Sequence, residues 1–305
     1  MHLALALISA AFGAATPIIL ASLGGLFTFH ANTFNIAMEG MMLVGAFFAV
    51  VGSYFFHSWL AGLFLGVAAA FLVSILFAVF SVTLRCDEFV TGIAINMVAL
   101  GGTTFLLRLL FNVKGAFVSD QIVALPRVHF AWLSAIPVVG PLFDGQSFLV
   151  YLSWLLVAVV SYFLYHTRFG LQLRATGEHA ETAASVGINP ARYKIGAALL
   201  SGVLSGLGGV YLSLGYVTLF TENMTNGRGF IALAAIILTR GSPAGVLLIS
   251  LVFGFCDGLG LVLQNASIPP QFTHMLPYLA TLVALYVYNA NWKHKQGRAI
   301  ADANA

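Results

Sequence analysis

Charged residues are scarce in this chain of 305 residues, and that scarcity decides its class. Aspartate, glutamate, lysine and arginine make up 8% of the sequence, whereas 60% of the residues are hydrophobic. A soluble domain carries about 25% charged residues, so this surface cannot face water on all sides. Repeated apolar runs of about 20 residues are typical of transmembrane helices. The composition therefore predicts an integral protein that crosses the cell membrane several times.

Motifs for catalysis and for ATP binding are absent as well. No Gly-Lys dipeptide occurs, so there is no P-loop, and His-Glu-x-x-His, Cys-x-x-Cys and Gly-x-Ser-x-Gly are also missing. The two cysteines, Cys86 and Cys256, lie far apart in the sequence, which disfavours a disulfide or a zinc site. The net charge of +3 reports orientation in a membrane rather than nucleic-acid binding. We expect no enzyme activity, no metal or cofactor held by this chain, and no nucleic-acid partner.

Hydropathy predicts an all-α fold, a bundle of about eight or nine transmembrane helices in one domain over residues 1–305. The apolar stretch 229–240 is too short to cross as a helix unless protein surrounds it. The loop 111–146 is long and contains Pro126, Pro137 and Pro141. The longer stretches are predicted to span the membrane at residues 3–27, 36–56, 59–84, 89–110, 147–165, 195–216, 243–263 and 274–290.

Lysine and arginine residues predict the orientation. If each apolar segment crosses once and the 166–194 loop is cytoplasmic, nine of these residues lie inside and four outside. The positive-inside rule favours this arrangement. It places the C-terminus inside and the 111–146 loop outside. With nine crossings it also places the N-terminus outside, unless 28–40 or 229–240 is re-entrant. The four outside residues are Arg108, Lys114, Arg127 and Arg228.

A faint internal repeat is visible. The apolar run ending at residues 23–25 (Leu-Gly-Gly) is followed by a polar patch around Asn35. The run ending at residues 207–209, with the same three residues, is followed by a polar patch around Asn223. Five crossings separate the two copies, so they would run in opposite directions. Inverted repeats with interrupted helices are typical of transporters, although Gly-rich apolar sequence also produces such likeness by chance.

Polar side chains at membrane depth mark a candidate solute pathway, because leaving them in hydrocarbon is costly. Each of them can also serve as a helix cap or a packing residue. Their amides and carboxylates have few cations nearby in the sequence, which suits an uncharged, hydrogen-bonding solute. The predicted pathway residues are Asn35, Glu39, Asn96, Glu222, Asn223 and Asp257.

The loop 166–194 is the longest polar run between two apolar segments, and it predicts one short helix over 177–187. Thr176 or Gly177 can cap the start of this helix, and Gly187 offers a left-handed stop. A helix this short is unstable alone in water and needs a surface to dock against. It is either an ordinary loop with a helical turn or a coupling helix that fits a groove on a soluble partner. The predicted coupling residues are Gly177, Glu178, Ala180, Ala183, Ala184 and Gly187.

Three separated motifs resemble the permease subunits of bacterial ABC importers of the branched-chain amino acid and ribose type, above all their nucleoside branch. The first is Leu-Gly-Gly-Leu-Phe at 23–27 followed by Asn-Ile-Ala-Met-Glu-Gly-Met-Met-Leu at 35–43. The second begins with Arg-Phe-Gly at 168–170 and ends with Gly-Ile-Asn at 187–189. The third is Asn-Met-Thr-Asn-Gly-Arg-Gly-Phe-Ile-Ala-Leu-Ala-Ala at 223–235.

This resemblance implies a fold of the cobalamin-importer type with a coupling helix at 177–187 seated on an ABC ATPase that binds ATP. It also implies a second, homologous permease subunit, an extracellular substrate-binding lipoprotein and contact with membrane lipid. The expected function is nucleoside import by alternating access. A sugar, riboflavin or a branched-chain amino acid remains an alternative substrate. An ion-coupled secondary transporter is the alternative class, with Glu39 and Asp257 as the candidate ion sites.

Overall fold

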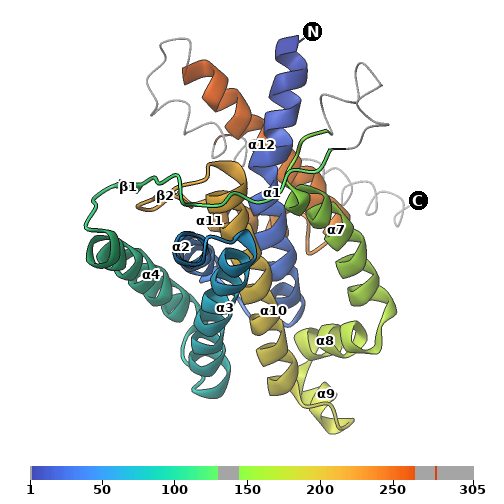
Figure 1. The fold of residues 1–305 in the computed structure, drawn as a ribbon. Coiled ribbons are helices and arrows are strands. Elements are labelled where there is room, and N and C mark those ends of the chain that lie inside the picture. The colour runs from blue at the N-terminus through green and yellow to red at the C-terminus, as the bar shows by residue number, and fades with distance from the viewer. Residues whose placement is uncertain (1, 130–143, 265–278, 280–305) are drawn as a thin grey trace.

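The computed structural model of the protein describes residues 2–129, 144–264 and 279, and it confirms an all-α helix bundle (Figure 1). Apart from residue 279, the predicted span 274–290 lies outside the described residues, as do Pro137 and Pro141. Two short antiparallel strands, β1 (Ala116–Phe117) and β2 (Phe220–Thr221), join the segments that follow α4 and η2. The helices are α1 (His2–His30), α2 (Met38–Phe56), α3 (Trp59–Ala78), η1 (Val79–Thr83), α4 (Glu88–Phe111), α7 (Phe148–His166), α8 (Arg168–Glu178), α9 (Ala180–Ser185), α10 (Pro190–Val210), η2 (Tyr211–Tyr216), α11 (Arg228–Leu238) and α12 (Pro243–Gln264).

Seven helical stretches within the described residues are long and apolar enough to cross a membrane. Two of them continue through a π-helical turn, α3 into η1 and α10 into η2. The α10 span begins at Pro190, earlier than hydropathy predicts, because Asn189 Oδ1 accepts hydrogen bonds from the first backbone amides and proline needs none at this position. Among the apolar helices of the described residues, α11 alone is too short to cross by itself, as its sequence predicts.

The two ends of the bundle are defined by contacts between distant segments. At one end, which we call the outer end, Leu125 N donates to Leu214 O, and Ser53 Oγ bonds to the backbone of Val123. At the inner end His30 Nε2 bonds to Gly241 O. Figure 1 shows α8 and α9 at the inner end, and the strands and the N-terminus toward the outer end. The 111–146 loop and the 166–194 loop therefore leave opposite ends, as the charge distribution predicts.

Two crossings are broken near the middle of the bundle. From the inner end of α1, the inner linker (residues 31–37) turns back into the bundle, and α2 completes the crossing to the outer end. From the outer end of η2, the outer linker (residues 217–227) enters the bundle, and α11 completes the crossing to the inner end. Neither 28–40 nor 229–240 returns to its own side. The two broken crossings run in opposite directions, as expected for the predicted inverted repeat.

Small residues bring α2, α3 and α10 into backbone contact at the centre. A Cβ added to Gly45 would lie 2.9 Å from Gly206 O, and one added to Gly66 would lie 2.6 Å from Gly45 O. In a bilayer, where no hydrophobic force drives helices together, such close approach is a main source of helix association. The close contacts of these glycines are made within one chain, so the glycines do not require a second copy of the chain as a packing partner.

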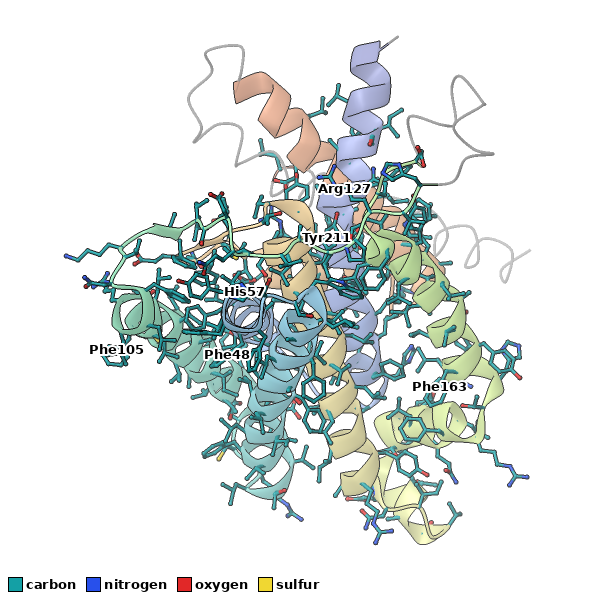
Figure 2. The ribbon with its side chains drawn as sticks, viewed as in Figure 1. Phe48, His57, Phe105, Arg127, Phe163 and Tyr211 are labelled. Carbon is teal, nitrogen blue, oxygen red and sulfur yellow. The ribbon has the colours of Figure 1, made fainter. Side chains whose placement is uncertain are left out.

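The periphery of the bundle is apolar and exposed. Among the most apolar 18 residues of each span, 28% are buried in α3–η1 and in α4, whereas 72% are buried in α1. Figure 2 shows Phe105 on the outside of α4, where it is 64% exposed, and Tyr211 near the middle of the bundle, where it is 2% exposed. The helices α1, α2 and α10 therefore form the interior, and α3 and α4 form part of the exposed apolar surface.

Cysteine labelling tests this orientation. In a background without Cys86 and Cys256, Asp120→Cys at the outer end should react with an impermeant thiol reagent in intact cells, because Asp120 is exposed. Ser185→Cys, exposed on α9, should react only after the cells are opened. The reverse pattern would invert the topology.

Candidate functional site

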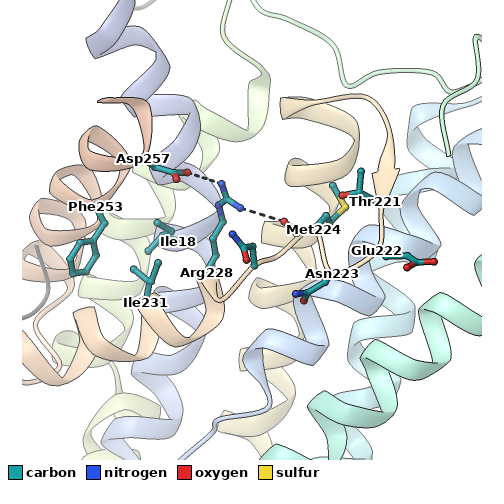
Figure 3. A pocket seen from close by; sticks show the side chains of 10 residues that line it. Ile18, Thr221, Glu222, Asn223, Met224, Arg228, Ile231, Phe253 and Asp257 are labelled. Carbon is teal, nitrogen blue, oxygen red and sulfur yellow. Dashed lines mark hydrogen bonds and ion pairs between the residues drawn. The ribbon is translucent and has the colours of Figure 1, made fainter. Parts of the chain in front are cut away.

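A polar cavity, the outer cavity, lies where the outer linker enters the bundle between α1 and α12. Its volume is about 370 Å³, within the range of about 300–1,000 Å³ that is usual for ligand pockets. One side is apolar, and the other carries amides and charged groups (Figure 3). Three of the predicted pathway residues, Glu222, Asn223 and Asp257, line it. The remaining lining residues are Ile18, Thr221, Met224, Asn226, Arg228, Ile231 and Phe253.

An ion pair forms the charged side of the outer cavity. Arg228 Nη2 donates to Asp257 Oδ2 over 2.6 Å, with side-chain exposures of 16% and 23% for the two residues. Arg228 Nη1 donates to the backbone oxygens of Met224 and Thr225, which holds the guanidinium in place. The pair itself carries no net charge. Counting Arg228 among the outside charges was wrong, because it lies inside the bundle at the start of α11.

Free hydrogen-bonding groups in the outer cavity come from two amides and one carboxylate. Asn223 and Asn226 make no side-chain hydrogen bond to any described residue, and only one oxygen of Asp257 is used by Arg228. Both asparagines have positive φ, 56° and 44°, a conformation that asparagine tolerates better than most residues. The tight turns of the outer linker thus present amides to the cavity, while apolar surface from Ile18 and Phe253 lies opposite (Figure 3).

Glu222 has a structural partner and is turned away from the cavity interior. Its Oε1 accepts hydrogen bonds from Gly115 N at 3.2 Å and from Arg108 Nη2 at 3.5 Å. Its backbone N–H also donates to Gly115 O, beside the β1–β2 ladder. Figure 3 shows its carboxylate pointing away from Arg228 and Asp257. Glu222 therefore ties the outer linker to the outer loop.

Glu39 does not line the outer cavity but holds the start of α11. Its two carboxylate oxygens accept hydrogen bonds from Gly227 N at 2.8 Å and from Gly229 N at 2.6 Å. Glu39 is 7% exposed, and backbone N–H groups at a helix start need partners when no water is present. A carboxylate suits this position because the helix dipole is positive there. A Cβ added to Gly229 would lie 2.6 Å from the Glu39 backbone, so glycine is required for this close approach.

Asn35 and Asn96 hold the start of α2 in a similar way. Asn35 Oδ1 accepts from Ala37 N at 3.0 Å, and Asn35 Nδ2 donates to Ser201 Oγ on α10 at 2.9 Å. Asn96 Oδ1 accepts from Gly40 N at 2.8 Å, and Asn96 Nδ2 donates to Ile36 O. The polar patches of the repeat thus meet at the bundle centre. There the side chains of Asn35, Asn96 and Glu39 form hydrogen bonds with the backbone at the starts of α2 and α11.

The predicted single helix over 177–187 is wrong, because the loop forms two helices with a break at His179. The first, α8, begins after Thr167, whose Oγ1 accepts from Gly170 N. Glu178 therefore ends α8 rather than starting a helix, and neither Thr176 nor Gly177 is an N-cap. The physical reason is a distant contact, since a Cβ on Gly177 would lie 2.0 Å from His30 O at the end of α1.

The predicted coupling residues are separated by this arrangement. Gly177 packs against α1, and Ala183, on the six-residue α9, is buried at 4% exposure against the chain itself. Ala180 is half-buried, whereas Ala184, Glu178 and Gly187 are exposed. The left-handed stop at Gly187, with φ of 87°, is confirmed. The predicted alanine face is therefore not a continuous exposed surface, because only Ala184 of its three alanines is exposed.

The comparisons with known proteins identify the family. A family model described as the permease component of the branched-chain amino acid transport system matches residues 7–285. The chain belongs to this family of ABC transporter permeases and is a multi-pass protein of the plasma membrane. No solved structure shows a significant match to the chain.

Three similar proteins carry the names of ABC transporter permeases. The guanosine ABC transporter permease protein NupQ of Bacillus subtilis is 34% identical over 89% of this chain and 88% of its own length. The nucleoside ABC transporter permease protein NupC of Lactococcus lactis is 36% identical over 90% of this chain and 89% of its own. A candidate glucose ABC transporter permease protein of Haloferax volcanii is 31% identical over 93% and 92%. These relatives are transport proteins, and the family implies an ABC ATPase and a substrate-binding protein as partners.

The capping role of Glu39 predicts a loss of stability on substitution. Glu39→Gln keeps the shape but leaves one acceptor oxygen for two backbone N–H groups and turns an NH₂ group toward the other. The free energy of unfolding should fall by about 1–3 kcal/mol, measured by thermal denaturation of the purified protein. Glu222→Gln, whose side chain is 29% exposed, is the control and should shift the midpoint less. A Glu39→Gln midpoint equal to that of the wild type would contradict this role.

Proposed function

We propose that the chain is the translocation subunit of a nucleoside importer and that the outer cavity receives the solute. The observation that carries this proposal is a cavity with a neutral ion pair, two free amides and an apolar side. A nucleoside is uncharged, presents several hydrogen-bond donors and acceptors, and has an apolar base face. The names of NupQ and NupC point to the same solute class.

The energy for transport would come from ATP bound and hydrolysed by the partner ATPase, with no cofactor in this chain. The two candidate ion sites do not favour an ion-coupled mechanism. Both carboxylate oxygens of Glu39 accept hydrogen bonds from the backbone at the start of α11, and the charge of Asp257 is balanced by Arg228. Alternating access would move the helices around the central contact between Glu39 and α11, with a second homologous permease completing the pathway and lipid surrounding the bundle.

Coupling to the ATPase would use the exposed surface of α9 and the turn after it. Ala184 is exposed there, and Val186 is 71% exposed although apolar. The preceding helix, α8, joins this surface to the bundle core through Leu173, which is fully buried, and through Gly177 against His30. A push on α9 would therefore reach the end of α1 and the inner linker.

Uptake by purified complexes in vesicles tests the proposed solute site. Asn226→Gly removes the amide without straining the positive φ, and one lost hydrogen bond is worth about 0.5–1.5 kcal/mol, so apparent affinity for guanosine should weaken about two- to tenfold. Asn112→Gly is the matched control, because Asn112 is exposed at the outer end with φ of 52° and lies off the cavity.

Equal effects of the two substitutions would argue against the cavity as a solute site. Competition by unlabelled ribose, riboflavin or leucine at the concentration where guanosine competes would favour one of the alternative substrates. Guanosine uptake that persists without ATP hydrolysis and collapses with an uncoupler would overturn the importer mechanism.

Docking on α9 is tested by Ala184→Arg. The new side chain enlarges an exposed position outside the bilayer, so the bundle should still fold, but binding of the ATPase should weaken and uptake should fall. Ala183→Arg is less informative because Ala183 is buried within the chain. Ala116→Arg, an exposed position at the outer end, is the control and should leave ATPase binding intact. An Ala184→Arg complex with wild-type ATPase binding and uptake would rule out this docking surface.

A further inference from the structure

A second cavity, the inner cavity, lies at the opposite end of the bundle from the outer cavity. Its volume is about 460 Å³. The end of α1, the inner linker, the end of α7 and the last turns of α8 form its wall. None of the predicted pathway residues reaches it, and Gly177 and Glu178 are the only predicted coupling residues that line it.

The inner cavity is the counterpart of the outer cavity in the inverted repeat, because each cavity lies beside the linker of one broken crossing. The outer cavity is lined by the outer linker just before α11, and the inner cavity by the inner linker before α2. Each cavity also holds one arginine and at least one carboxylate from a neighbouring helix. In the outer cavity these are Arg228 and Asp257, and in the inner cavity Arg174 and Glu178.

Aromatic rings dominate the inner cavity. Phe29, Phe34 and Tyr165 line it, and Phe34 and Tyr165 are 41% and 42% exposed. The guanidinium of Arg174 lies over the Tyr165 ring, 5.1 Å from its centre. Aromatic faces and arginine planes are the surfaces on which nucleobases stack. Arg174 can donate hydrogen bonds there and Glu178 can accept them, so the charges of these two side chains balance.

Two polar groups at the inner cavity have no partner among the described residues. The Thr33 hydroxyl, on a side chain that is 2% exposed, makes no hydrogen bond, and neither does Nε of Arg174. Buried polar groups nearly always have partners, because an unsatisfied one costs free energy. Both atoms are covered by the protein, so they are not among the groups that a ligand in the inner cavity would contact.

We propose that the inner cavity binds the base of the transported nucleoside on the cytoplasmic side, stacked on Tyr165 and Arg174. This inference rests on the proposed function for the class of ligand. Bound there, the nucleoside lies between α8 and the inner linker, at the contact where Gly177 meets His30. Nucleoside on the inner side would then oppose the movement of α8 against α1 and inhibit further uptake.

Protection of a cysteine from alkylation measures binding directly. Phe34→Cys, in the complete complex without Cys86 and Cys256, places a thiol in the inner cavity. Guanosine added to the inner side should slow its alkylation, whereas ribose, which has no base, should not. Ser185→Cys, exposed on α9 outside the cavity, is the control whose rate should not change. Equal rates with and without guanosine would overturn the proposal, and protection by inorganic phosphate alone would make the cavity an anion site instead.

Uptake into preloaded vesicles measures the consequence. The ratio of uptake into guanosine-loaded vesicles to uptake into empty ones should be well below one for the wild type and for Tyr165→Phe. Tyr165→Ala removes the stacking ring, so the inside concentration needed for inhibition should rise at least about fivefold. Tyr162→Ala is the control, because Tyr162 lies one turn earlier on α7, 64% exposed and stacked on His166 away from the cavity.

This experiment distinguishes a failure of the importer proposal from a failure of the inner-cavity proposal. ATP-dependent uptake into empty vesicles reports the importer function without reference to the inner cavity. If that uptake occurs and a guanosine load leaves it unchanged, the inner site is wrong while the importer stands. Equal inhibition of wild type and Tyr165→Ala would also place the inhibition elsewhere.

Discussion

The contact between the Glu39 carboxylate and the first backbone amides of α11 is the constraint on which the rest of the bundle depends. A helix that starts in the middle of a membrane leaves backbone N–H groups without water or a preceding turn, and each such group is costly in an apolar medium. Glu39 satisfies two of them at once, while Asn35 and Asn96 satisfy the start of α2. Broken crossings exist here because these side chains replace the missing partners.

Two cavities lie on opposite sides of this contact between Glu39 and α11. Outside it, the outer linker builds a polar cavity around Arg228 and Asp257. Inside it, the inner linker and α8 build an aromatic cavity around Arg174 and Tyr165. On the proposed pathway, a solute would have to pass a centre that is closed by side-chain hydrogen bonds. Movement driven from α9 through α8 would act on the inner cavity first, because α8 rests on the end of α1.

The sequence predicts well what depends on local composition and poorly what depends on distant contacts. The apolar runs predict seven spans and the short helix α11. The distribution of lysine and arginine predicts that the 111–146 and 166–194 loops leave opposite ends of the bundle. Glu39 is recognisable as a buried acid, but its partners lie 188 and 190 residues away, so its capping role is not visible. The break at His179 is missed for the same reason, because local capping signals say nothing of Gly177 against His30. Arg228 is misplaced because its partner, Asp257, belongs to another helix.

The account is tested most directly by experimental structures of the complete complex open to each side in turn. It predicts that the Glu39 oxygens stay within hydrogen-bond distance of Gly227 N and Gly229 N in both states, while the outer cavity closes in one and the inner cavity in the other. A structure in which Glu39 leaves α11 and binds the solute would contradict the account, because the carboxylate would then belong to the pathway and not to the joint around which the pathway moves.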